Sequence, residues 1–185
     1  MEGEKSFARR HWFLLSFFLI VLILAALIYY FFFHTTGYRG SSNVTNPAAN
    51  LSIEEAVAQF NSGFIYYLLY SIKAYNLHNP LFSSDTPKIE IHVGADIYNA
   101  IIENGNIKVQ NGEIANKDII IVTTKEDAVK MMKDTTYVQD SFRNGNSQIE
   151  LVAGKTTLFM KGYLNLYSEL TGKSMTGSVI EKIFG

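Results

Sequence analysis

Two short stretches of the sequence resemble the end of a phosphate-binding loop. They are Gly154-Lys155-Thr156 and Gly172-Lys173-Ser174. A complete loop of this kind needs another glycine five residues before the glycine that precedes the lysine, because the backbone N–H groups of the whole turn surround the phosphates. Ile149 and Tyr167 occupy those two positions. We therefore do not expect nucleotide binding.

The residue types that carry most catalytic and metal chemistry are absent or scattered. The chain has no cysteine, which excludes disulfides, thiolate metal sites and cysteine nucleophiles. Its four histidines, at positions 11, 34, 78 and 92, do not have the spacing of metal ligands. There is no Gly-x-Ser-x-Gly nucleophile motif, and the carboxylates show no pairing. The sequence predicts a protein that is not an enzyme and that uses no cofactor or metal.

The charge of the C-terminal part excludes a nucleic-acid partner. Residues 51–185 carry 12 Lys plus Arg and 15 Asp plus Glu, a net charge of −3. A protein that binds the phosphate backbone concentrates its basic residues on one face, whereas these lysines are spread singly along the sequence. The lack of disulfides in a domain predicted to be exported also favours a prokaryotic source.

Residues 13–33 form a run of 21 residues without a charged side chain. As a helix this run would be about 31 Å long, enough to cross a hydrocarbon core of about 30 Å. Three basic residues come just before it and only Arg39 comes soon after, so the positive-inside rule predicts a cytoplasmic segment 1–12 and an extracytoplasmic C-terminal part. A cleavable signal peptide would have a shorter apolar region and a small-residue cleavage site. We expect a retained signal-anchor in the cell membrane, spanning it once.

Residues 34–50 have the Gly, Ser, Thr and Asn content of a flexible linker. Two glycosylation sequons lie here, at Asn43 and Asn50, and the predicted orientation exposes both to an extracytoplasmic glycosyltransferase. Such tripeptides also occur by chance in linkers of this composition. Ser52 of the second sequon also looks like a helix cap, which favours Asn43 over Asn50 as the glycosylation site.

Residues 51–185 are predicted to form one α+β domain. Ser52 to Glu55 reads as a capping box, and apolar residues at helical spacing predict one helix from Ile53 to Tyr75. Two further helices are expected, a short one after Thr124, with a further turn around 137–142, and one over 157–170. An amphipathic turn is expected over 179–184. Five strands are expected, at Ile89–Val93, Ile97–Glu103, Ile107–Gln110, Asp118–Thr124 and Gln148–Ala153.

Asn104-Gly105-Asn106 and Asn111-Gly112 are the predicted hairpin turns between these strands. The expected architecture is a small, mainly antiparallel sheet of about five strands, covered by helices and preceded by one transmembrane helix.

Soft apolar and aromatic side chains are concentrated on the elements expected to cover the sheet. Thioethers and rings adapt to irregular ligands, so these residues are candidates for an apolar binding cavity, although ordinary core packing explains them as well. The candidate ligand-binding residues are Phe60, Phe64, Leu68, Ile119, Ile121, Met131, Met132, Phe159, Met160 and Tyr163.

Three stretches in this order of elements carry a family resemblance: Asp118 to Met132, Phe142-Arg-Asn-Gly145 and Ile149-Glu-Leu151. Together they resemble the sterol carrier protein 2 domain over about residues 89–170. The resemblance implies a five-stranded sheet with helices that enclose an apolar tunnel for fatty acyl chains, sterols or other lipids. Members of that family are usually soluble and intracellular, whereas this chain is predicted to lie outside the membrane.

Two functions remain open. The first is a membrane-tethered, non-catalytic domain that binds a lipid or another apolar ligand, which predicts an internal cavity on the order of 300 Å³ or more. The second is an envelope-anchored protein-interaction module or accessory subunit without a small-molecule ligand. It is suggested by Tyr66, Tyr67 and Tyr70, which one apolar stripe cannot bury completely. The membrane is a partner in both, and a membrane protein is a further partner in the second.

Overall fold

The computed structural model describes residues 16–26 and 44–173, which belong to two separate units, Met1–Gly37 and Tyr38–Gly185. Residues 16–26 form a helix whose apolar side chains are exposed. Within the described ranges, no helix combines the length and the apolar character needed to cross a membrane. Residues 13–15 and 27–33 of the predicted span, Asn43 and the predicted turn over 179–184 lie outside the described residues.

The second unit is built on a five-stranded sheet with the strand order β3-β2-β1-β4-β5. Neighbouring strands are antiparallel except for the central pair β1 and β4, which are parallel. The predicted α+β class and the five strands are confirmed, and the sheet is mixed. The strands are β1 Lys88–Val93, β2 Asp96–Glu103, β3 Asn106–Asn111, β4 Ile119–Thr123 and β5 Gln148–Leu151.

One of the two predicted hairpin turns is present. Asn104 and Gly105 join β2 to β3 with φ angles of 51° and 77°, the pattern that a type I′ turn requires at both central positions. Asn111-Gly112 does not make a hairpin. Instead, the chain leaves β3 and crosses the outer face of the sheet over residues 112–117, where the Asn99 side chain donates a hydrogen bond to the Gly112 carbonyl oxygen at 2.9 Å.

The helix predicted from Ile53 to Tyr75 is three elements: α2 Ile53–Ala58, α3 Ser62–Ser71 and the 3-10 turn η1 Ala74–Asn76. The capping box at Ser52 is confirmed. Asn50, the asparagine of the sequon that includes Ser52, is exposed. The first break occurs because Asn61 is fully extended and its side-chain oxygen accepts a hydrogen bond from the Gly63 N–H at 2.8 Å. An asparagine cap of this kind starts a new helix, which the apolar periodicity alone does not reveal.

The described residues form four more helices: α4 Lys125–Lys133, α5 Tyr137–Arg143, α6 Lys155–Met160 and α7 Tyr163–Thr171. Thr124 caps α4 as predicted. The helix predicted over 157–170 divides into α6 and α7 because Gly162 lies between them with a φ of 84°. This left-handed conformation ends a right-handed helix and suits glycine.

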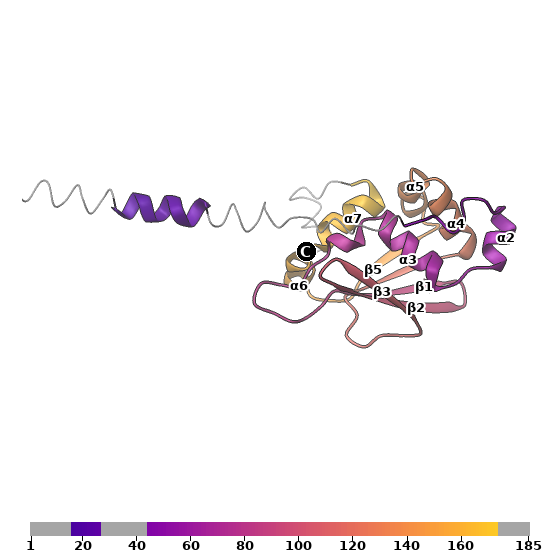
Figure 1. The fold of residues 1–185 in the computed structure, drawn as a ribbon, viewed down its shortest axis with the longest axis horizontal. Coiled ribbons are helices and arrows are strands. Elements are labelled where there is room, and N and C mark those ends of the chain that lie inside the picture. Colours follow the sequence, from indigo (N-terminus) through magenta and orange to yellow (C-terminus); the bar gives the residue numbers. More distant parts are fainter. Residues whose placement is uncertain (1–15, 27–43, 174–185) are drawn as a thin grey trace, which may run out of the picture. The chain divides into compact units, whose positions relative to one another are not determined.

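Helices α3, α4, α5 and α7 lie on one side of the sheet, and no helix of residues 44–173 covers its other side (Figure 1). Alternate strand residues point toward these helices and form the core with them; Ile89 and Ile91 of β1 and Ile119 and Ile121 of β4 are all at most 3% exposed. On the opposite face of β4, Val122 is 41% exposed. The helix-covered side of the sheet therefore holds the apolar interior in which a ligand site was predicted.

Candidate functional site

The apolar interior between the sheet and the helices contains one small void of about 10 Å³. A cavity of this size has no more than the space of a single water molecule. The expectation of an internal cavity of 300 Å³ or more is therefore wrong for this conformation, because the side chains fill the space. The void is lined by Ile65, Leu68, Leu69, Ile72, Ile91, Ile121, Met131, Phe142 and Leu170.

Three of the predicted ligand-binding residues, Leu68, Ile121 and Met131, line this void. Three others are buried in the same core without facing it: Phe64, Ile119 and Met132. Phe60 is partly buried at the edge of the core, with its ring centroid 5.2 Å from that of Phe64. The structure thus gathers most of the predicted set into one core.

Phe159 and Met160 lie outside this core, contrary to their predicted role as cavity residues. Their exposed fractions are 61% and 43%, while Leu158 beside them is 1% exposed. The cause is the shortness of α6, which has only six residues and packs a single side chain, Leu158, fully into the core. The three tyrosines cited for a protein-interaction surface are partly buried and pack against the core.

A larger pocket of about 300 Å³ opens to the surface between α5, β5 and α7. Phe142 lines both this pocket and the apolar void, so the two spaces meet at this residue. The cationic side chains Arg143 and Lys173 also line the open pocket. Its remaining lining residues are Gly145, Ser147, Gln148, Ile149, Tyr167 and Thr171.

Three hydroxyl groups connect the floor of the open pocket to the sheet. The Ser147 hydroxyl lies 2.7 Å from that of Ser141 and 2.8 Å from that of Thr123, and all three residues are at most 3% exposed. The pocket therefore combines a rigid polar floor, two cations and an apolar wall at Phe142. Phe142 was part of the family resemblance, but nothing in the sequence showed that it would separate a surface pocket from the core.

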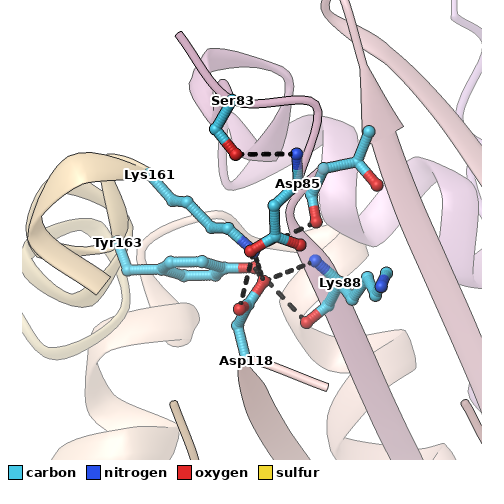
Figure 2. A network of polar contacts seen from close by, with 7 residues as sticks. Ser83, Asp85, Lys88, Asp118, Lys161 and Tyr163 are labelled. Atoms are coloured by element: carbon cyan, nitrogen blue, oxygen red, sulfur yellow. Dashed lines mark hydrogen bonds and ion pairs between the residues drawn. The ribbon is translucent and has the colours of Figure 1, made fainter. Parts of the chain in front are cut away.

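A buried polar cluster lies at the opposite end of α7 (Figure 2). Its centre is Lys161, which is 1% exposed. The Lys161 Nζ lies 2.9 and 3.0 Å from the two carboxylate oxygens of Asp118, 3.1 Å from the Thr86 carbonyl oxygen and 2.8 Å from an Asp85 carboxylate oxygen. These acceptors satisfy the three N–H donors of the ammonium group, so Lys161 has none left for a substrate.

Tyr163, one of the predicted ligand-binding residues, is buried and contributes its hydroxyl to this polar cluster. Its hydroxyl lies 3.0 Å from an Asp118 carboxylate oxygen and 3.3 Å from the Lys88 carbonyl oxygen. Burial, together with the Asp118 charge, raises the pKa of Tyr163, which keeps the hydroxyl protonated as a donor. The Lys88 N–H donates to the same carboxylate at 2.7 Å. The cluster therefore fastens the first residue of α7 to β1 and to the start of β4.

The two ends of α7 consequently have different surroundings. Tyr163 at its start is held by the polar cluster, whereas Tyr167 and Thr171 in its second half border the open pocket. Among the residues that the structure describes, no group of three or more His, Asp or Glu side chains is placed to hold a metal ion.

No protein-family model matches the chain, and a search of curated proteins finds no match. Among solved structures, it is similar to sterol carrier protein 2 like 2 from Aedes aegypti, with 18% identity, a TM-score of 0.34, and coverage of 59% of this chain and 94% of that one. The solution NMR structure of a palmitated form of the mosquito protein is also similar, with 21% identity and a TM-score of 0.32; the match covers 56% of this chain and 94% of that one. The ubiquinone synthesis protein UbiJ-SCP2 has 10% identity and a TM-score of 0.34, and the match covers 58% of this chain and 79% of that one.

Proposed function

We propose that this protein is a membrane-tethered, non-catalytic domain that binds an apolar ligand between its helices and its sheet. The observation that carries the proposal is that Phe142 lines both an open pocket of about 300 Å³ and a wholly apolar void. A ligand with a long hydrocarbon chain gains about 0.8 kcal/mol for each methylene group that it buries. The family resemblance of the sequence suggests the same class of ligand.

Binding requires the filled core to open at the Phe142 side. The first half of α7 is held at Tyr163 by buried polar contacts, so a movement that separates α5 from the second half of α7 costs least. Met131 lines the void and has the flexible thioether side chain that adapts to a new neighbour. We infer that the hydrocarbon chain replaces the Phe142 ring and lies along Leu68, Ile121 and Met131.

Phe142→Ala is expected to increase the affinity for a fluorescent long-chain fatty acid, because it removes the ring that closes the void. Phe142→Trp, which adds volume at the same place, is expected to decrease it. The measurement is a fluorescence titration of the detergent-solubilised chain, with the free detergent held constant. Phe60→Ala is the matched control, since Phe60 is also partly buried but lies outside both spaces.

Opposite changes for the two Phe142 variants, with no change for Phe60→Ala, would support the proposed site. If Phe60→Ala changes the affinity and the two Phe142 variants do not, the ligand binds elsewhere. If neither the unmodified chain nor Phe142→Ala binds the probe, the domain has no apolar ligand. The closed core, with its void of about 10 Å³, favours the second candidate in that case, an interaction module or accessory subunit without a ligand.

The tether in this proposal is the apolar segment 13–33, with the domain on the extracytoplasmic side. The chain is expected to remain in the membrane fraction after extraction at alkaline pH. A reporter that is active only in the cytoplasm is expected to stay inactive when it is fused after Gly185. Replacing Lys5, Arg9 and Arg10 by Glu, with lysines added after Phe33, is expected to weaken or invert this orientation. Reporter activity with the unmodified sequence would show that the orientation is wrong.

A further inference from the structure

Exposed apolar side chains gather at one end of the domain, next to the buried polar cluster. Leu81 and Phe159 are each 61% exposed, Met160 is 43% exposed and Phe82 is fully exposed. We refer to these four residues as the apolar tip. Leu81 and Phe82 lie on the loop between η1 and β1, and Phe159 and Met160 end α6.

Lys161 brings the two segments of the apolar tip together. Its carbonyl oxygen accepts a hydrogen bond from the His78 N–H at 3.2 Å, and its Nζ contacts Asp85 and Thr86, at the other end of the same loop. The loop that carries Leu81 and Phe82 is thus fastened at both ends to the residue that follows Met160. Figure 2 shows the Asp85 carboxylate turned toward Lys161, and the Ser83 hydroxyl accepting a hydrogen bond from the Asp85 N–H. The two segments that carry the apolar tip are therefore joined at Lys161.

Phe82 has a backbone conformation that phenylalanine rarely adopts. Its φ is 63°, and it lies inside a turn that the Ser83 N–H closes on the Pro80 carbonyl oxygen at 3.0 Å. Glycine and asparagine adopt this region readily, whereas a bulky side chain there is an outlier. Neither packing nor backbone preference explains an exposed phenylalanine at this position. Strain of this kind is typical of residues that act on something outside the fold.

We propose that the apolar tip dips into the interfacial layer of a lipid bilayer. Asp85 is the only acidic residue in the loop over 79–86, and its carboxylate lies 2.8 Å from the Lys161 Nζ, which it shares with Asp118. Lys155 lies four residues before Phe159 on α6, where its ammonium group can reach lipid phosphates while the ring enters the apolar layer. Phenylalanine and leucine are the side chains that interfacial segments bury.

The inference rests on the proposed membrane tether. The tether also explains why the four side chains of the apolar tip are enough for contact with a bilayer. Residues 44–50 belong to the folded domain, where Ala48 is buried in the core, so only residues 34–43 separate it from the predicted span. Ten residues cover at most about 36 Å when fully extended, which keeps the domain close to the bilayer that holds the anchor. Because the tether already holds the domain at the membrane, a weak contact between the apolar tip and the bilayer is enough to orient the domain. The bilayer is therefore the partner that the length of the chain makes available to this surface.

The absence of cysteine allows a direct test with one attached fluorophore. The full chain is reconstituted into phosphatidylcholine and phosphatidylglycerol vesicles that contain a nitroxide-labelled lipid as quencher. One sample carries the fluorophore at Ser84→Cys, next to the tip, and another at Asn111→Cys, an exposed position at the far end of β3. We expect several-fold stronger quenching at position 84 than at position 111. Equal quenching, or stronger quenching at 111, would overturn the proposal.

Substitutions separate the tip from the fold and from the tether. Phe82→Asn in the Ser84→Cys chain is expected to reduce the quenching to the level at position 111 without lowering the melting temperature, because asparagine accepts the positive φ. Val122→Thr, which changes an exposed apolar residue of the sheet, is expected to leave the quenching unchanged. Unchanged quenching in Phe82→Asn would also contradict the proposal. Chains that fail to float with the vesicles after alkaline treatment would instead show that the tether itself is wrong.

Discussion

Replacing Lys161 by methionine is expected to lower the free energy of unfolding by about 3 to 5 kcal/mol, the usual cost of removing one partner from a buried ion pair. Methionine keeps most of the side-chain volume but leaves the Asp118 carboxylate, at most 4% exposed, without its counter-charge. The loop over 85–86 also loses its contact with Nζ. The measurement is urea unfolding of the detergent-solubilised chain, followed by circular dichroism.

Two variants make this result specific. Lys155→Met removes an exposed lysine from α6, the helix that ends just before Lys161, and is expected to change the stability by no more than about 0.5 kcal/mol. Adding Asp118→Asn to Lys161→Met is expected to recover part of the loss, because an amide oxygen still accepts from Tyr163 and from the Lys88 N–H without a buried charge. Wild-type stability in Lys161→Met would mean that the polar cluster does not hold α7 in place.

The second large effect is a loss of stability in acid that depends on Glu90. This residue is 1% exposed on the helix-free face of the sheet, where its carboxylate oxygens lie 2.6 Å from Lys117 Nζ, 2.8 Å from His92 Nε2 and 3.1 Å from the Ile114 N–H. Burial by itself raises the pKa of Glu90, but these hydrogen bonds outweigh it and lower the pKa from 4.5 to about 2.

The sign of the effect follows from this lowered pKa. The unfolded chain takes up the proton near pH 4.5 and the folded chain only near pH 2, so the stabilisation is complete above pH 4.5 and is lost as the pH falls toward 2. A difference of this size corresponds to about 3 kcal/mol at 1.36 kcal/mol per pKa unit. Between pH 5 and pH 2, the free energy of unfolding of the wild-type protein is expected to fall by about 3 kcal/mol more than that of Glu90→Gln.

The control for the acid effect is Glu150→Gln, which changes an exposed glutamate of the edge strand β5. It is expected to follow the wild-type pH dependence. Glu90→Gln should also loosen the segment over 112–117, which Glu90 holds through Ile114 and Lys117, and hydrogen exchange at the Ile114 amide reports this. Parallel pH curves for wild type and Glu90→Gln would show that Glu90 does not supply the acid sensitivity.

Local patterns in the sequence were sufficient for most of the elements. Short apolar or alternating runs identify all five strands, including the continuous apolar run over 119–122, and Asn104-Gly105 identifies its hairpin. Both signals are properties of neighbouring residues. The caps at Ser52 and Thr124 were predicted for the same reason. Where two local signals compete, the prediction was wrong: the apolar stripe continues through Asn61 and across Gly162, but both residues end or restart a helix.

The candidate site was less accessible to sequence reasoning. Hydropathy correctly places Leu68, Ile121 and Met131 in the interior, since burial of apolar side chains is general. It cannot tell which apolar residues of a short helix point outward, so Phe159 and Met160 were assigned to the cavity although they are exposed. It also cannot tell a filled core from a hollow one, because that depends on how side chains from α3, α5, α7 and the sheet fit together.

The sequence by itself determined the α+β class, the five strands, the uncharged run over 13–33 and the absence of cysteine chemistry. Only the tertiary structure decided which distant residues meet. Asp118 and Lys161 are 43 residues apart and Phe142 lies between two spaces, and neither relation leaves a trace in local periodicity. The physical reason is that period, caps and turns depend on neighbours in the chain, whereas pairing and packing depend on neighbours in space.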